Sequence, residues 1–300
     1  MAATTPLDPG TQASRPRWGF TDEELATLPH AFRDGLLDGQ VCVVSGGGSG
    51  IGRAMAFLYA RLGASVVICG RREEKLRSTA DAIRRLLGRD IDCRAMTIRD
   101  PAQVDGLIAG TFERHGRLDL LVNNGGGQFP QAALDYSVKG WHAVIDTNLN
   151  GTWWMMQAAA RQWRDRGQQG SIVNIVANVW RGMPQVAHTC AARAGVIYLS
   201  KSVAVEWAPL GIRVNCVSPG SIATEGLGVY PPGAAEQFGD ANPLRRYGDA
   251  LDIAQAALYV GIPATGKFIT GEVLVVDGGN QLWGDVWPGG IPDWFRVTQR

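Results

Sequence analysis

The chain lacks an apolar run of the ~20 residues that a membrane-spanning helix needs, although 45% of its 300 residues are hydrophobic. Lysine is scarce, with only four among the 29 basic residues, and the net charge is +1. A nearly neutral chain has no bulk electrostatic attraction to nucleic acid or to a membrane surface. We therefore expect neither nucleic acid nor a membrane as a partner.

Cysteine is also sparse, and its pattern excludes several kinds of site. The five cysteines are odd in number, widely spaced and free of any CxxC pair, so they predict neither a disulfide framework nor a metal centre. The first eighteen residues lack the apolar core of a secretory signal. We expect a cytoplasmic protein with reduced cysteines and no metal.

Short apolar runs and helix-period segments alternate between residues 36 and 283. Seven runs are strand candidates: 41–45, 64–69, 94–98, 118–123, 171–177, 212–218 and 272–277. Helical patterns fall at 50–62, 73–87, 101–115, 140–166, 190–209 and 249–260. This alternation predicts one α/β domain, a doubly wound Rossmann-like sheet of seven parallel strands with helices on both faces. An N-terminal extension (1–35), with a short helix at 21–28 capped by Thr21, and an aromatic tail (284–300) flank it.

A glycine-rich turn follows the first strand candidate and precedes a helix. Glycines let the backbone approach a pyrophosphate closely, and the free N–H groups of the helix start face its charge. The strand–turn–helix context makes this a dinucleotide-binding motif rather than a chance pattern. The predicted cofactor contacts here are Ser45, Gly46, Gly48, Ser49, Gly50, Ile51 and Gly52.

The end of the second strand candidate carries the signal for the type of dinucleotide. Gly70, Arg71 and Arg72 follow Cys69 where an NAD enzyme would place a carboxylate for the ribose hydroxyls. Two guanidinium groups without a carboxylate favour a 2′-phosphate, hence NADP(H). The alternative is two solvated arginines that open the next helix.

Together with this turn, three further motifs resemble the short-chain dehydrogenase/reductase family over roughly residues 36–283. They are Asn123-Asn124-Gly125-Gly126, Asn148 within TNLNGTW, and Pro219-Gly220 with Ile222 and Thr224 behind it. The resemblance implies that Asn124, Gly125, Pro219, Gly220, Ile222 and Thr224 contact the cofactor.

The family's catalytic tyrosine and lysine, at YxxxK, are missing from this chain. The aligned segment places Thr189 at the tyrosine position and Arg193 at the lysine position, and Val176-Ala177 replaces the usual serine. Asn148 alone remains of the usual set. Tyr198 is no substitute, because at about 100° per residue it lies roughly 180° around the helix from Thr189. We expect it to face the core or a subunit contact.

Other polar residues are candidates for the missing roles. The cation of Arg193 could hold the nicotinamide ribose or a developing oxyanion, and the ordinary pKa of a histidine such as His188 suits proton transfer. The alternatives are a packed histidine and, for Thr189, a simple helix cap. We assign Asn148, His188, Thr189 and Arg193 to catalysis and Gln128, Phe129, Asn178, Trp180 and Arg181 to the substrate.

The segments 123–130, 139–144 and 191–196 look most like trans-2-enoyl-CoA reductases of the peroxisomal type and bacterial citronellol-type dehydrogenases. That resemblance implies NADP(H)-dependent hydride transfer to or from a hydrophobic enoyl or keto acyl thioester or a terpenoid. A non-redox or regulatory dinucleotide-binding protein, or a lyase or isomerase, is the alternative, because fold alone does not decide function.

The family also implies a homodimer or homotetramer, paired through helices 140–166 and 190–209. We expect residues 222–248, small and apolar, to form a lid over the site.

Overall fold

The computed structural model describes residues 18–230 and 235–282. Seven parallel strands form one sheet in the order β3-β2-β1-β4-β5-β6-β7, which confirms the predicted fold class. The strands are β1 (Val41–Ser45), β2 (Ser65–Gly70), β3 (Asp92–Ala95), β4 (Leu120–Asn123), β5 (Gly170–Ile175), β6 (Ile212–Pro219) and β7 (Val273–Val276). The predicted tail 284–300 and the first seventeen residues lie outside the described residues.

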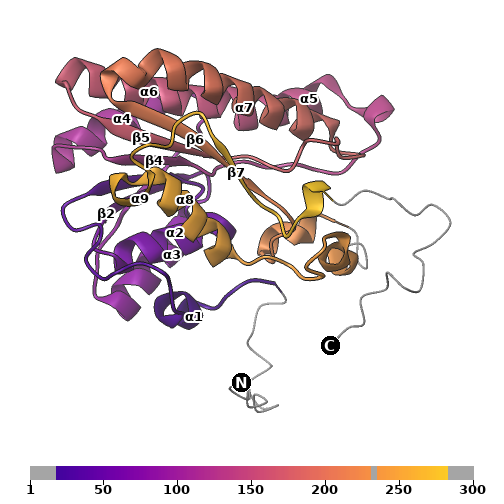
Figure 1. The fold of residues 1–300 in the computed structure, drawn as a ribbon, viewed down its shortest axis with the longest axis horizontal. Helices are drawn as coiled ribbons and strands as arrows, with labels where there is room; N and C mark the ends of the chain where they lie inside the picture. Colours follow the sequence, from indigo (N-terminus) through magenta and orange to yellow (C-terminus); the bar gives the residue numbers. More distant parts are fainter. Residues whose placement is uncertain (1–17, 231–234, 283–300) are drawn as a thin grey trace, which may run out of the picture.

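Helices cover both faces of the sheet (Figure 1). One face carries α2 (Gly50–Arg61), α3 (Glu73–Leu87) and α8 (Ala250–Gly261), and the other α4 (Pro101–His115), α6 (Gly151–Arg166) and α7 (Ala187–Trp207). Each layer has its own cluster of buried apolar side chains, because every central strand is apolar on both faces. Trp163 of α6 is fully buried and donates its indole N–H to the Leu118 carbonyl at 2.8 Å, so packing explains this tryptophan.

The short helix α1 (Asp22–Thr27) packs against α2 and α3. Thr21 caps it as predicted, in a capping box with Glu24. Leu25 is buried in the cluster beneath, and Asp22 pairs with Arg53 of α2 at 2.5 Å. Although this part of the N-terminal extension precedes the sheet in sequence, it is therefore packed onto the domain.

The pattern over 140–166 predicted one helix, and the structure corrects this. The segment consists of α5 (Val138–Ile145), a π-helical turn η3 (Asp146–Asn150) and α6. A π turn inserts an extra residue into the helical repeat and is frequent at functional sites. Here it contains Asn148, whose side chain is buried.

The crevice at the carboxyl ends of the strands is where the functional loops meet. Because β1 lies between β2 and β4, the chain winds outward in opposite directions from this point, which is where α/β folds bind ligands. The segment after β6 forms the 3₁₀ helices η5 (Glu225–Val229) and η6 (Ala235–Ala241) beside the crevice, in orange in Figure 1. The remaining elements are η2 (Ala133–Asp135), η4 (Ala208–Leu210), α9 (Pro263–Gly266) and η7 (Asn280–Leu282). In the part of the chain that the structure describes, no helix has the length and apolarity to cross a bilayer.

Candidate active site

The glycine turn between β1 and α2 has the geometry of an anion-binding loop. Gly46 has φ +71°, which favours glycine, and a Cβ on Gly52 would lie 2.2 Å from the Gly46 carbonyl oxygen. Larger residues at these positions would push the helix away from the strand. Ser49, the N-cap of α2, makes no side-chain bond to the helix, so the first N–H groups of α2 stay available to a ligand.

A cleft of about 340 Å³ lies over this turn. Its walls come from the glycine turn, the end of β2, the segment after β3 and the loop after β4. Of the predicted cofactor contacts, Gly46, Gly48, Ser49, Gly50, Ile51, Arg71, Arg72, Asn124, Gly125 and Thr224 line it. Ser45 lies beneath, where its hydroxyl accepts the N–H groups of Asn124 and Gly125 at 3.1 and 2.9 Å. A glycine-lined cleft at a helix N-terminus fits a dinucleotide.

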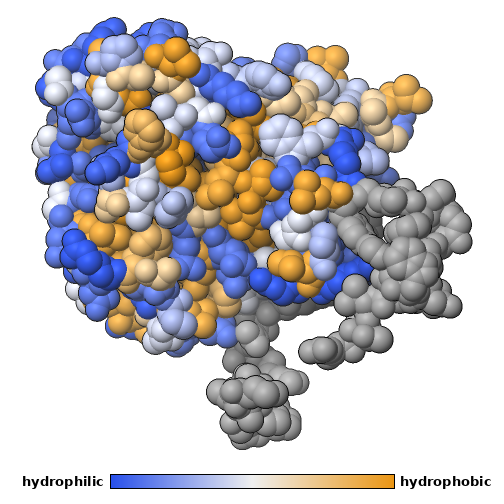
Figure 2. Space-filling view, in the orientation of Figure 1, coloured by the Kyte–Doolittle hydropathy of each residue, from blue (hydrophilic) through white to orange (hydrophobic). Residues whose placement is uncertain are grey.

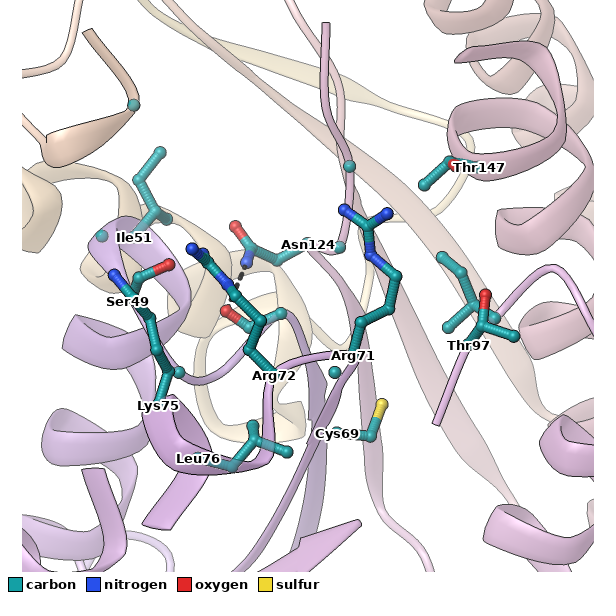
Figure 3. Close-up of a pocket in the computed structure, with 18 of the residues that line it drawn as sticks. Ser49, Ile51, Cys69, Arg71, Arg72, Lys75, Leu76, Thr97, Asn124 and Thr147 are labelled. Atoms are coloured by element: carbon teal, nitrogen blue, oxygen red, sulfur yellow. Dashed lines mark hydrogen bonds between the residues drawn. The ribbon is translucent and has the colours of Figure 1, made fainter. Parts of the chain in front are cut away.

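Three cationic side chains line this cleft (Figure 3). The side chains of Arg71 and Arg72 extend from the end of β2, Arg72 toward Ser49 and Arg71 nearer Thr97. Both are exposed and, among residues 18–230 and 235–282, neither makes an ion pair. Lys75, from the first turn of α3, lines the same cleft. Lys75 was not predicted from the sequence, although it lies one helical turn after the two arginines.

A second and larger cavity, of about 820 Å³, adjoins the cleft. The two share Ser49, Ile51 and Asn124 in their walls. Three predicted catalytic residues, Asn148, Thr189 and Arg193, line the larger cavity. So do Pro219, Gly220, Ile222 and Thr224 of the predicted cofactor set and Gln128, Asn178 and Arg181 of the predicted substrate set. The tertiary fold thus brings most of the predicted residues to one connected space.

Arg193 of α7 is buried at 8% exposure and points across the crevice. Its Nη1 donates to the carbonyl of Ile175, the last residue of β5, at 2.9 Å. A Cβ on Gly126 would lie 2.2 Å from Nη2, so the glycine makes room for the guanidinium. Burial lowers the pKa of Arg193 to about 10, which leaves it charged near neutrality. In the part of the chain that the structure describes, no hydrogen bond is formed by Nη2, and Arg193 lines the larger cavity.

Asn148 fixes the loop after β4. Its Oδ1 accepts the Gly127 N–H at 3.0 Å, and its Nδ2 donates to the Gly127 carbonyl at 2.9 Å. Both ends of the amide are therefore bonded to the backbone of one residue, Gly127. Through these two bonds, the π turn that contains Asn148 holds the Gly125–Gly127 segment in place beside Arg193.

His188 lies behind Thr189 rather than in the wall of the larger cavity. Its ring stacks on the Tyr136 ring and packs edge-on against the Phe129 ring, with 4.6 Å between the ring centroids in each pair. Nδ1 accepts the Thr189 backbone N–H at 2.7 Å and lies 3.3 Å from the Thr189 hydroxyl oxygen. Burial lowers the pKa of His188, which favours the neutral ring. Phe129, predicted to contact substrate, belongs to this aromatic cluster and is also absent from the cavity wall.

The loop after β5 is tied to the segment after β7. Asn178 donates to Asp277 at 2.9 Å and to Asn280 at 3.0 Å, and Arg181 donates to the Asn280 carbonyl at 2.8 Å. Trp180, the third predicted substrate residue of this loop, is exposed and lies outside the cavity wall.

Tyr198 lies on the outer face of α7, as the helix geometry predicted. It is 68% exposed and packs against the ammonium of Lys201, which is 5.3 Å from the ring centroid. In a single chain it faces solvent rather than the core, so its phenol cannot reach the cavity on the opposite side of the helix.

A glycine turn at the switch point of a seven-stranded parallel sheet, next to a cavity lined by polar side chains, defines a dinucleotide-binding protein of the Rossmann class. The model of the family described as enoyl-(acyl carrier protein) reductase matches residues 46–281. With this match and the relatives below, the chain belongs to the short-chain dehydrogenase/reductase family, whose members are oxidoreductases that use a nicotinamide dinucleotide.

Relatives and solved structures agree with this assignment. A probable 2,4-dienoyl-CoA reductase of Bacillus subtilis is 36% identical over 82% of this chain and 98% of its own. The peroxisomal 2,4-dienoyl-CoA reductase of Danio rerio is 36% identical over 87% and 88%. The citronellol catabolism dehydrogenase of Pseudomonas aeruginosa PAO1 superposes with a TM-score of 0.74 at 37% identity, over 83% and 98% of the two chains. A 3-ketoacyl-(acyl-carrier-protein) reductase of Brucella melitensis, complexed with NADH, has a TM-score of 0.74 at 30% identity, over 81% and 99%.

Proposed function

We propose that this protein is an NADP(H)-dependent reductase of α,β-unsaturated acyl thioesters. The observation that carries the proposal is the larger cavity, which adjoins the glycine-lined cleft and is lined by Thr189 and by Arg193. The conversion of dienoyl-CoA named for two relatives supports the thioester class. A keto acyl compound or a terpenoid alcohol/aldehyde pair is the next choice, in line with the citronellol enzyme.

The three cationic side chains in the wall of the cofactor cleft support NADP(H) over NAD(H). A 2′-phosphate forms charge-assisted hydrogen bonds with guanidinium groups, and each is worth ~1.5–3 kcal/mol. Arg71, Arg72 and Lys75 would hold that phosphate, and the glycine turn would hold the pyrophosphate. The nicotinamide, when bound, supplies or accepts the hydride.

The residues of the cavity wall suit a thioester whose carbonyl oxygen gains negative charge during reduction. The free Nη2 of Arg193 and the hydroxyl of Thr189 would stabilise that oxygen, and donors of this kind are worth ~2.7–4 kcal/mol each. Asn148 would act by holding the Gly125–Gly127 loop in place. Neither role requires the proton transfer that a YxxxK tyrosine performs on an alkoxide.

The rest of the cavity wall favours a hydrophobic chain with a polar head. The wall includes eight apolar side chains: Pro130, Val176, Met183, Pro184, Val186, Leu227, Val229 and Phe238. An acyl chain would be buried against these groups. Arg181 is exposed and lines the same cavity, so it would meet an anionic carrier group such as that of CoA.

The proposal is tested with the purified protein, NADPH and a panel of 2-enoyl-CoA, 2,4-dienoyl-CoA, 3-ketoacyl-CoA and citronellal. Loss of nicotinamide absorbance with one of the two unsaturated thioesters is the expected result. Consumption only with citronellal would move the substrate class to terpenoids. NADPH binding without consumption across the whole panel would refute redox turnover and favour the non-redox alternative.

Replacing His188 by phenylalanine tests its proposed role, which is to hold Thr189. The ring would keep its place beside Tyr136, but the acceptor for the Thr189 N–H would be lost. We expect kcat to fall about tenfold at similar KM, since one neutral hydrogen bond is worth ~0.5–1.5 kcal/mol. His142→Phe, on the exposed surface of α5, is the control. Unchanged kcat would remove His188 from the mechanism.

Acid stability gives a second measurement on the same variant. Burial lowers the pKa of His188 below its ordinary 6.5, so the unfolded chain binds this proton before the folded chain does. The wild type therefore loses stability at this site as the pH falls below about 6.5. His188→Phe should lack that component, measured as the pH dependence of the free energy of unfolding.

We also propose a cytoplasmic homo-oligomer. All five cysteines are free, as is usual in a reducing compartment.

The surface of the domain supports the homo-oligomer. Apolar side chains gather in the middle of the face shown in Figure 2, over the edge strand β7, whose four residues are only partly buried. On α6 and α7, Trp153 stacks on Trp207 and Val205 is exposed. Light scattering at micromolar concentration should report a dimer or tetramer, and a monomer would contradict this.

A further inference from the structure

The missing YxxxK tyrosine leaves open which group donates a proton, and the positions of the other tyrosines narrow the choice. All six tyrosines of the chain lie in the described residues. Tyr59 is buried in the core, and Tyr198 and Tyr259 are exposed. The Tyr136 hydroxyl donates to the Gln185 carbonyl and accepts the Ala187 N–H, and the Tyr247 hydroxyl donates to the Ala235 carbonyl. Of the six, Tyr230 alone lines the larger cavity.

Tyr230 reaches the cavity from the segment after β6. It follows the 3₁₀ helix η5, and its ring meets Phe238 edge-on at 4.9 Å. Gln128, from the loop after β4, donates its side-chain N–H to the Tyr230 hydroxyl oxygen at 2.6 Å. Two segments separated by 102 residues are thus joined across the cavity.

The direction of this hydrogen bond matters chemically. Because the Tyr230 oxygen accepts from Gln128, its own O–H proton is not used in that bond and can be donated to a ligand. The phenol is partly buried, and burial raises its pKa above the usual 10. It therefore keeps its proton at neutral pH, as an acid must before it acts.

We propose that Tyr230 is the proton donor of the reduction, oriented by Gln128; this rests on the proposed function. Saturating the double bond needs a hydride at Cβ, which the reduced nicotinamide dinucleotide supplies, and a proton at Cα. The Tyr230 O–H bond breaks as the Cα–H bond forms, and the electron pair delocalised toward the thioester carbonyl becomes that new bond. The phenolate then takes a proton from water, which restores the enzyme.

The Tyr230→Phe substitution removes the phenolic hydroxyl group and keeps the aromatic ring. We expect kcat with 2-enoyl-CoA to fall by roughly 10²–10⁴-fold, the usual contribution of a positioned acid. The KM and the affinity for a saturated acyl-CoA in the presence of NADP⁺, measured by calorimetry, should stay within about threefold. Gln128→Leu should produce a smaller fall in kcat. Tyr198→Phe, on the outer face of α7, is the matched control and should behave as wild type.

The stereochemistry of the product separates proton donation from a merely structural role. In D₂O the wild type should place deuterium on one face of Cα, whereas the residual turnover of Tyr230→Phe should place it on both. Wild-type kcat in Tyr230→Phe, or unaltered one-faced deuteration at reduced kcat, would overturn the assignment while the reductase function stands. A wild type that consumes no NADPH with any substrate of the panel would overturn both.

Discussion

Replacing Arg193 by methionine is expected to lower kcat for 2-enoyl-CoA reduction by roughly 10²–10³-fold, the usual loss when one oxyanion donor is removed. The buried guanidinium keeps Nη1 on the Ile175 carbonyl and presents Nη2 beside Gly126. Methionine fills a similar volume without charge. Burial lowers the pKa of Arg193 to about 10, so the cation persists across the neutral range and the loss should not vary with pH there. Steady-state kinetics with NADPH and a short 2-enoyl-CoA measure it.

Two further variants separate the charge of Arg193 from its contribution to packing. Arg193→Lys keeps the charge and should recover part of the lost kcat. Arg213→Met is the matched control, because Arg213 also donates to buried carbonyls, those of Val260 and Gly261, at 2.7 and 2.5 Å, but lies outside the cavity wall. It should lower the melting temperature and leave kcat unchanged. Equal losses of kcat in Arg193→Met and Arg213→Met would show that Arg193 acts through stability alone.

Replacing Arg71 by aspartate is expected to reverse the cofactor preference. The change removes a charge-assisted bond worth ~1.5–3 kcal/mol, which lowers kcat/KM for NADPH by roughly 10- to 160-fold. It also places a carboxylate at the end of β2, where it can accept the ribose hydroxyls of NADH. The measurement is the ratio of kcat/KM for the two cofactors at one fixed salt concentration.

The control for this prediction is Arg77→Asp. Arg77 lies on α3, is exposed, pairs with Glu73 at 2.5 Å and does not line the cofactor cleft. It undergoes the same change in charge close to the site, so it reports any general electrostatic effect. An unchanged NADPH preference in Arg71→Asp, or an equal shift in Arg77→Asp, would contradict the assignment of Arg71 to the 2′-phosphate.

Much of the fold was predictable because the burial pattern of a parallel sheet is local. The runs at 41–45, 64–69 and 212–218 match β1, β2 and β6 to within one residue at either end. The run at 94–98 was misplaced, because β3 spans Asp92–Ala95. The helix predicted over 140–166 was also wrong, because the apolar pattern continues through a π turn. Side-chain hydrophobicity reports which face is buried but not whether the backbone bond spans four or five residues. The one extra residue that positions Asn148 was therefore missed.

Some residues of the site were also predictable from the sequence, and others were not. The glycine turn, Asn148 and Arg193 were predicted because each belongs to a motif of fixed spacing, and the structure places all three around the two adjoining cavities. His188 was predicted as a catalytic residue and Phe129 as a substrate contact, and the structure places both in an aromatic cluster behind the cavity wall. At a helix start, a shift of one residue turns a side chain by about 100°. Spacing alone therefore did not separate Thr189, in the wall, from its neighbour His188 behind it.

The sequence by itself determined the doubly wound sheet, the dinucleotide turn, the paired arginines after the second strand and the absence of the YxxxK tyrosine. Each of these can be recognised from short segments of contiguous residues. Only the tertiary structure decided which side chains share the larger cavity, and it joined Gln128 to Tyr230 across 102 residues. The physical reason is that the loop after β4 and the segment after β6 have no periodic pattern of their own. Their side chains are brought together by the order of the strands from which they extend.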